Sequence, residues 1–321
     1  MKLLITGASG FVGRALLAQS VARGYAEVVG IGRRSWDHPH YRSYDLTQPL
    51  HLDFTPDVVV HAAARSSPWG SVREFQRQNV DATRHVVDFC LRHGRPKLIY
   101  LSSSSVFYRH EHQFGLSETS PIGPSFVNTY AETKYLGERY IREYPGAWSI
   151  LRPRAVFGRD DTVLFPRILK AARAGRLPLI ETADGQPAVG DLISIDSLVH
   201  YILRVAESPR ITGDYNLTQA EPVSLLPFLL RIFQELGLPP PQRRISVQRA
   251  MRLAGITETL FRALPFLGEP PITRFGVSVF AYSKTFDVGK MLSDLGPPPE
   301  TLDAAVASFV SWEKERQASI S

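Results

Sequence analysis

A glycine-rich turn near the N-terminus is the feature that most constrains the fold of this chain. Residues 2–6 form a short apolar run that predicts a buried strand, and the apolar spacing of residues 11–23 predicts a helix. Glycines between them let backbone N–H groups approach a pyrophosphate at the positive end of the helix dipole. The spacing is Gly-x-x-Gly-x-x-Gly, a variant of the usual fingerprint. The turn predicts a dinucleotide site formed by Gly7, Ser9, Gly10, Phe11, Val12 and Gly13.

Strands and helices alternate through the first half of the chain. Apolar runs predict strands at residues 27–32, 42–45, 57–61, 97–102 and 148–152, and helical spacing predicts helices at 71–93 and 128–144. This alternation indicates an α/β fold, a Rossmann-like doubly wound parallel sheet covered on both faces.

The alternation stops after residue 158. The sequence then predicts a helix at 164–174, strands at 177–180 and 189–195 separated by a turn at 183–185, and helices at 224–236, 246–264 and 300–316. We expect residues 1–158 to be the cofactor domain. Residues 159–321 are expected to form a smaller substrate-binding region, with part of 189–217 returning to the sheet.

Composition excludes several classes of protein. The net charge of +6 suits anionic ligands, but the arginines are spread along the 321 residues, so a nucleic-acid surface is not indicated. The sequence contains no apolar stretch of membrane-spanning length and no signal peptide before the first strand. The single cysteine, Cys90, allows no internal disulfide and gives no metal-ligand spacing. We expect a cytoplasmic protein without a metal site.

Tyr130 and Lys134 lie four residues apart in the helix predicted at 128–144, so their side chains share one face. A nearby ammonium stabilises a phenolate and lowers the phenol pKa from about 10. The pair therefore predicts a proton carrier for an alcohol oxygen. By itself, however, the same spacing also occurs on solvated helices.

A run of serines, Ser102 to Ser105, stands at the end of the strand predicted at 97–102. Doubly wound folds bind ligands at this end of their strands, although serines there also end strands and cap turns. The glycine turn, the strand-end serines and the Tyr-x-x-x-Lys pair have the order and spacing of one family. The chain resembles the extended short-chain dehydrogenase/reductases of the NAD(P)-dependent epimerase/dehydratase family, over nearly its whole length.

The resemblance implies a role for each matching residue. Ser103, three residues before Val106, would orient the reacting oxygen, Tyr130 would be the acid/base, and Lys134 would lower its pKa and hold the nicotinamide ribose. Asn79 matches an asparagine linked to the lysine or to helix geometry; a buried asparagine that satisfies backbone groups is the alternative. Asn79, Tyr130 and Lys134 are also expected at the cofactor. The other implied cofactor positions are Asp45, Leu46, His61, Ala62, Ala63, Ala64, Ser102, Pro153, Arg154 and Val156.

The end of the strand at 27–32 bears on the choice of cofactor. An NAD enzyme usually has an acidic residue there, which accepts from the ribose 2′-hydroxyl. This chain has Arg33 and Arg34 instead, and an arginine can bind a 2′-phosphate. We therefore favour NADP(H), with NAD(H) possible and two solvated surface arginines as the alternative.

Departures from the nucleotide-sugar members of the family bear on the substrate. Ala155 stands where those enzymes usually have an asparagine, and the arginine often found before the stretch at 191–196 is missing. Motifs at 68–70, 161–178 and 268–287 resemble the 3β-hydroxysteroid dehydrogenase and 2-alkyl-3-oxoalkanoate reductase branch. Residues 246–267 are apolar on one side, which suits a substrate site, a membrane surface or packing between helices.

We expect an NAD(P)-dependent oxidoreductase that interconverts a secondary alcohol and a ketone on a largely apolar small molecule, a 3-oxo or 3-hydroxy acid or a sterol-like compound. One alternative is a nucleotide-sugar epimerase, dehydratase or 4-reductase. Another is a non-catalytic NADP-sensing or RNA-binding relative, which typically lacks the tyrosine or lysine present here. The resemblance also implies a homodimer, and peripheral membrane contact is left open.

Overall fold

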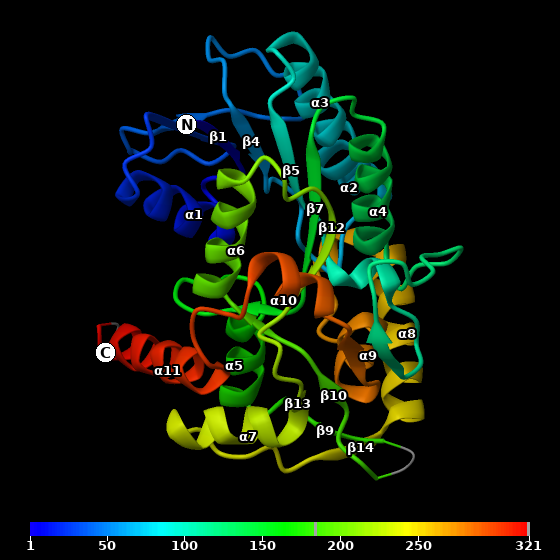
Figure 1. Ribbon diagram of the computed structural model, residues 1–321. Coiled ribbons are helices and arrows are strands. Elements are labelled where there is room, and N and C mark those ends of the chain that lie inside the picture. Colours follow the sequence, from blue (N-terminus) through cyan, green and yellow to red (C-terminus); the bar gives the residue numbers. More distant parts are fainter. Residues whose placement is uncertain (183–184, 320–321) are drawn as a thin grey trace.

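The structure is a computed structural model that describes residues 1–182 and 185–319. Within these residues the central sheet has seven parallel strands in the order β12-β7-β5-β4-β1-β2-β3 (Figure 1). The strands are β1 Lys2–Thr6, β2 Glu27–Gly32, β3 Tyr41–Ser43, β4 Val58–His61, β5 Lys97–Leu101, β7 Trp148–Pro153 and β12 Gly213–Leu217. This order is that of a doubly wound nucleotide-binding sheet, which confirms the predicted fold class.

Alternate residues of β1 explain why the sheet is covered on both faces. Leu3 and Ile5 belong to one hydrophobic core, and Leu4 belongs to another on the opposite face. The first core includes residues of helices α1 (Phe11–Ala22) and α6 (Ile195–Glu207), and the second includes residues of α3 (Ala82–Arg92) and α4 (Thr129–Arg142). A strand buried on both faces needs apolar residues at every position, as the sequence of β1 has.

The prediction of one regular α-helix at 71–93 is wrong, because the segment is helical but irregular. It consists of α2 (Val72–Phe75), a π-helical segment η1 (Gln76–Asp81) and α3. A capping box starts it, because the Ser71 hydroxyl accepts from the Glu74 N–H while the Glu74 carboxylate accepts from the Ser71 N–H. Single-turn π segments often occur at functional sites, and this one contains Asn79.

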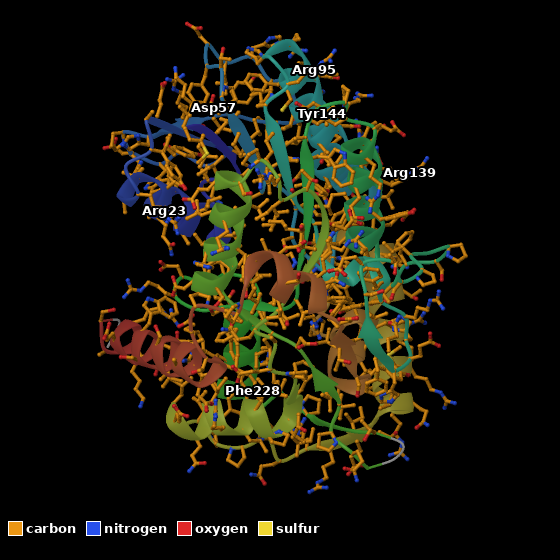
Figure 2. All side chains as sticks on the ribbon, viewed as in Figure 1. Arg23, Asp57, Arg95, Arg139, Tyr144 and Phe228 are labelled. Atoms are coloured by element: carbon orange, nitrogen blue, oxygen red, sulfur yellow. The ribbon has the colours of Figure 1, made fainter. Side chains whose placement is uncertain are left out.

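A third core lies in the other half of the molecule. It joins α5 (Phe165–Arg173), α7 (Leu225–Glu235) and α11 (Leu302–Ala318). In Figure 2, Phe228 of α7 marks this half, and Tyr144, which belongs to the core beside α3 and α4, marks the sheet half.

The remaining elements are β6 Gln113–Leu116, β8 Val156–Phe157, β9 Leu179–Glu181, β10 Val189–Gly190, β11 Ile193–Ser194, β13 Val223–Ser224, β14 Arg244–Ser246, β15 Lys284–Phe286, α8 Val247–Ala263, α9 Arg274–Ala281, α10 Gly289–Leu295 and the 3₁₀ turns η2 Ser104–Phe107 and η3 Pro265–Leu267.

The prediction of a single strand at 189–195 is also wrong, because the structure has two short strands there. Residues 189–190 form β10 in a sheet of order β13-β10-β15-β6, whereas residues 193–194 form β11, which pairs with β8. Asp191 separates them, because its buried carboxylate accepts a hydrogen bond from the Phe286 N–H at 3.0 Å. The turn predicted at 183–185 falls partly outside the described residues.

The chain then returns to the central sheet through α6 and β12. Strand β12 pairs with β7 over five residues, from Gly213 with Ser149 to Leu217 with Pro153. Lys97 Nζ reinforces this return by donating to the carbonyl oxygens of Val205, Ser208 and Ile211 at 2.6, 2.6 and 2.7 Å. Along the chain, α6 and β12 therefore lie between two segments, 159–194 and 218–319, of the region predicted to bind substrate.

Residues 1–182 and 185–319 contain neither a helix suited to span a membrane nor a cluster of metal-binding side chains. None of the helices there has both the length and the hydropathy of a membrane span. The same residues include no group of three or more His, Cys, Asp or Glu side chains arranged to hold a metal ion.

Candidate active site

The glycine-rich turn between β1 and α1 has no room for side chains at two positions. Gly7 has φ +71°, and a Cβ there would lie 2.7 Å from the Ala63 Cα. A Cβ on Gly13 would overlap the Gly7 carbonyl oxygen. Gly10 caps α1 without a side chain, and the first helical turn has no acidic residue, so its N–H groups suit an anion. This cradle fits the pyrophosphate of a dinucleotide.

His61 at the end of β4 ties the sheet to a neighbouring helix. Its Nδ1 lies 2.7 Å from Thr6 Oγ1 and its Nε2 lies 3.0 Å from Thr83 Oγ1. Burial, with a smaller effect of Lys134, lowers the pKa of His61 to about 3, so the ring is neutral. Because both ring nitrogens are engaged inside the protein, a cofactor contact from this motif has to come from backbone or from the half-buried Ala62, Ala63 and Ala64.

Tyr130 lies in the first turn of α4, with Ser66 and Ser103 near its hydroxyl. Burial raises the pKa of Tyr130, and the interactions with Ser66 and Ser103 act in the opposite direction. We expected from the sequence that Lys134 would lower the phenol pKa, whereas in the structure burial has the largest effect on it and raises it. The phenol is therefore protonated at neutral pH, ready to donate. Ser66 was missed by the sequence argument, and its only signal is its place just after the alanine motif.

Lys134 lies one helical turn after Tyr130 and is buried. Its Nζ lies 4.0 Å from the centroid of the Tyr100 ring. Burial lowers the pKa of Lys134 to about 7, while the charge of Glu138 acts to raise it. The side chain can therefore gain or lose a proton near neutral pH.

The hydroxyls of the serine run have different partners. Ser102 donates to Glu138 Oε1 at 2.6 Å, and Ser104 Oγ lies 3.1 Å from the Tyr108 hydroxyl. Ser103 Oγ caps the 3₁₀ turn η2 by accepting from the Ser105 N–H at 3.2 Å. Of these serines, Ser103 is the one that also interacts with Tyr130, the predicted proton carrier.

Asn79 joins two segments beside Lys134. Its Oδ1 accepts from the Arg65 N–H at 2.7 Å, and its Nδ2 donates to Thr133 Oγ1 at 3.0 Å. Asn79 is buried within η1, where the widened backbone brings its amide between the loop after β4 and helix α4. Asn79 is thus hydrogen bonded to Thr133, the residue before Lys134.

A buried ion pair behind the serines was not foreseen from sequence. Arg152 Nε and Nη2 donate to the two oxygens of Glu138 at 2.8 and 2.7 Å, and both side chains are fully buried. Arg152 Nη2 also lies 2.9 Å from Asp214 Oδ2 of β12. Charge spacing along the sequence gives no signal for it, because its three residues come from α4, β7 and β12.

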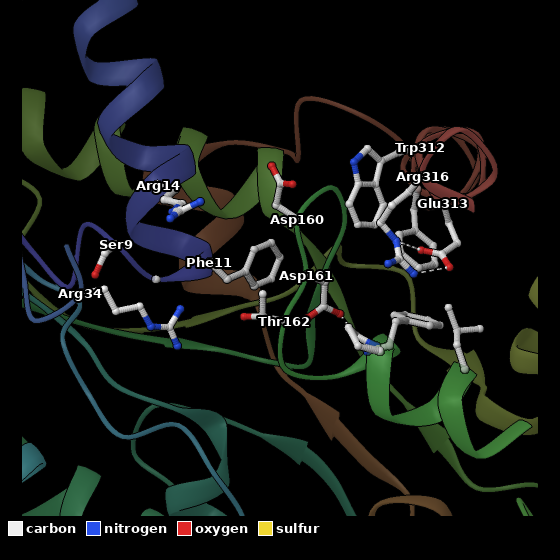
Figure 3. Close-up of a pocket in the computed structure, with 15 residues that line it drawn as sticks. Ser9, Phe11, Arg14, Arg34, Asp160, Asp161, Thr162, Trp312, Glu313 and Arg316 are labelled. Atoms are coloured by element: carbon white, nitrogen blue, oxygen red, sulfur yellow. Dashed lines mark hydrogen bonds and ion pairs between the residues drawn. The ribbon is translucent and has the colours of Figure 1, made fainter. Parts of the chain in front are cut away.

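A cavity of about 300 Å³ opens beside the glycine turn (Figure 3). Ser9, Phe11, Arg14 and Arg34 line one side, and residues 160–162 and the helix α11 line the other. Of the two arginines predicted at the cofactor, both exposed, Arg34 lines this cavity and Arg33 does not. Arg14 was missed; its signal is an arginine directly after the third glycine.

The remaining predicted cofactor positions differ in accessibility. Asp45 is exposed and its Oδ1 accepts from the Thr47 N–H at 3.0 Å, whereas Leu46 is buried. At the end of β7, Pro153 is buried and Val156 is half-buried. Arg154 is buried with its guanidinium 5.2 Å from the centroid of the Tyr108 ring.

A second cavity, of about 740 Å³, reaches α4 next to Tyr130. Asn128 and Thr129, the two residues before Tyr130, are among its lining residues. Its walls carry the aromatic side chains of Trp69, Phe75, Phe126 and Phe275, together with charged groups of α8 and α9. It is larger than the cavity beside the glycine turn, and it lies next to the predicted proton carrier.

Comparison with known proteins identifies the family of this chain. The family model described as the NAD dependent epimerase/dehydratase family matches residues 3–218. The chain belongs to the NAD-dependent epimerase/dehydratase family. With the fold and the oxidoreductase relatives below, the chain is an NAD(P)-dependent oxidoreductase of the extended short-chain dehydrogenase/reductase type, as the sequence predicted.

Three known proteins illustrate the similarity. The 2-alkyl-3-oxoalkanoate reductase of Stenotrophomonas maltophilia is 31% identical over 94% of this chain and 95% of its own length. The decarboxylating sterol-4-alpha-carboxylate 3-dehydrogenase of Homo sapiens is 28% identical over 75% of this chain and 68% of its own. The solved structure of MoeE5 in complex with UDP-glucose and NAD has a TM-score of 0.75, 22% identity, and coverage of 99% and 100%. This last likeness shows the fold.

Proposed function

We propose that this protein is an NADP(H)-preferring oxidoreductase that interconverts a secondary alcohol and a ketone on a largely apolar 3-oxo or 3-hydroxy acid or sterol-like substrate. The observation that carries the proposal is the placement of Ser66 and Ser103 near the hydroxyl of a half-buried, protonated Tyr130, directly after two residues, Asn128 and Thr129, that line an aromatic cavity. Relatives named 2-alkyl-3-oxoalkanoate reductase and sterol-4-alpha-carboxylate 3-dehydrogenase support this substrate class.

The proposed mechanism assigns one task to each residue. The nicotinamide, when bound, supplies or accepts the hydride at the carbinol carbon. In reduction Tyr130 donates its proton to the carbonyl oxygen, and in oxidation the deprotonated Tyr130 takes the hydroxyl proton. Ser103 donates to the same oxygen and orients it. Lys134, whose pKa burial lowers to about 7, returns a proton toward Tyr130 near neutral pH.

Discrimination between NADPH and NADH offers a matched pair of variants. Arg34→Ala should weaken NADPH binding about ten- to a hundredfold and leave NADH nearly unchanged, because a charge-assisted contact contributes about 1.5–3 kcal/mol. Arg33→Ala is the control, since Arg33 does not line the cavity at the glycine turn. The measurement is the Kd of each cofactor by fluorescence titration. Tighter wild-type binding of NADH than NADPH would refute the preference.

The substrate class predicts a trend with chain length. Each CH₂ buried in the aromatic cavity should add about 0.8 kcal/mol, so kcat/KM for 3-oxo acid derivatives should rise about fourfold per carbon until the cavity is filled. The assay follows nicotinamide absorbance across the series, with UDP- and TDP-sugars beside it. A flat series together with micromolar binding of a nucleotide sugar would favour the epimerase or dehydratase alternative.

The location and assembly are part of the proposal as well. A cytoplasmic location fits a chain in whose described residues no helix suits a membrane span. A homodimer is the default that the family resemblance implies, and gel filtration with light scattering tests it.

A further inference from the structure

Helix α8 buries small residues and exposes three of its large apolar ones. Ala250, Ala254 and Gly255 are buried against the neighbouring α9, which lies beside α8 in Figure 1. Leu253, Ile256 and Leu260 are 46%, 67% and 47% exposed. A surface helix of a soluble protein normally has the opposite arrangement, with its large apolar residues facing the core.

The exposed residues form one continuous apolar stripe. Ile256 follows Leu253 by three residues and Leu260 follows Ile256 by four, so these three side chains lie on the same face of α8. Leu264, exposed as well, is the residue at which α8 ends. Phe266, which is 81% exposed, and the exposed Leu267 extend the stripe into η3. Single exposed apolar residues are ordinary, but a stripe of six marks an interaction surface. We call it the α8 stripe.

The charges around the α8 stripe are almost all positive. Residues 243–274 contain six arginines and two glutamates, a net charge of +4. Arg249 and Arg252 are exposed on α8, next to the first residues of the stripe. An apolar stripe bordered by arginines is typical of helices that lie in the surface of an anionic membrane. A second copy of this chain would bring two such positive faces together, which disfavours self-association.

The other side of α8 faces the large aromatic cavity. Glu258 and Arg262 of α8 line that cavity, and so does Thr129, the residue before Tyr130. A surface bound through the α8 stripe would therefore lie next to the wall of the cavity that reaches the proton carrier.

We propose that the α8 stripe docks the protein reversibly on an anionic lipid bilayer, with α8 and η3 lying in the interface. Leu253, Ile256, Leu260, Leu264, Phe266 and Leu267 enter the boundary between headgroups and acyl chains. Arg249 and Arg252 contact lipid phosphates. The docking stands on exposed residues alone, so it does not require the proposed function to be correct.

The experiment is vesicle co-sedimentation of the full chain. Vesicles of phosphatidylcholine alone are compared with vesicles that also contain phosphatidylglycerol, at low and high salt. Ile256→Ser/Phe266→Ser removes apolar contact, and Arg249→Gln/Arg252→Gln removes charge. The matched control is Leu91→Ser/Leu292→Ser, which makes the same kind of change at exposed leucines of α3 and α10. Circular dichroism and Tm check that each variant folds.

The wild type and the control should sediment with the anionic vesicles, less so at high salt. Each test pair should lower the apparent vesicle affinity at least about tenfold. Turnover of a short, water-soluble substrate should stay within about twofold in the Ile256→Ser/Phe266→Ser variant, since neither residue belongs to the proposed site. Absence of wild-type binding to anionic vesicles, or equal binding by both test variants, would overturn the proposal. So would a wild-type dimer that this serine variant converts to monomer, which would assign the stripe to a second copy.

Discussion

Replacing Tyr130 by phenylalanine is expected to lower kcat by about 10²–10⁴-fold, because general acid–base catalysis contributes that much. The substitution removes only the hydroxyl that lies near Ser66 and Ser103, so the ring can keep its place in α4. Nicotinamide absorbance gives the turnover, and a fluorescence titration should show nearly unchanged cofactor binding.

The matched control for this experiment is Tyr140→Phe. Tyr140 lies on the same helix and is half-exposed, and it is not part of the contacts around Ser103. Removal of the Tyr140 hydroxyl should leave kcat within about twofold of the wild-type value. Near-normal turnover of Tyr130→Phe, with its fold confirmed, would refute the proton-carrier role.

Arg152→Met is expected to lower the free energy of unfolding by about 3–5 kcal/mol. The substitution keeps a long side chain but leaves the fully buried carboxylate of Glu138 without the two hydrogen bonds it accepts from Arg152. Denaturant unfolding, followed by circular dichroism, measures the change.

Two further variants separate the buried charge from a general effect of losing an arginine. Arg167→Met breaks an exposed ion pair with Glu269, and its cost should stay below about 1 kcal/mol. Glu138→Leu/Arg152→Met removes both buried charges and should recover part of the lost stability. If Arg152→Met is no more costly than Arg167→Met, the buried pair does not have the proposed importance for stability.

The sequence predicted the sheet well for a physical reason. Strands buried on both faces need unbroken apolar runs, and these are visible without any knowledge of partners; the prediction for residues 27–32 agrees with β2 at both ends. The glycine turn and the pairing of Tyr130 with Lys134 are equally local, since both follow from spacing along a single helix or turn.

Features set by distant parts of the chain could not be predicted. Strand β15 pairs with β6 by joining Lys284 to Gln113, and neither run has a strong apolar pattern. The ion pair of Glu138 and Arg152 depends on how α4 packs on β7. The π segment around Asn79 depends on polar partners, the Arg65 N–H and the Thr133 hydroxyl, that lie 14 and 54 residues away.

Strand β12 is the last strand of the central sheet to be synthesised, and this order affects the nascent chain on the ribosome. Until residues 213–217 emerge, β7 is an open edge with unpaired backbone groups, which favours association with other extended chains. Lys97 Nζ meanwhile lacks the three carbonyl acceptors that residues 205–211 provide. A nascent chain ending at residue 158 therefore exposes the β7 edge and leaves Lys97 without these partners until the later segment is made.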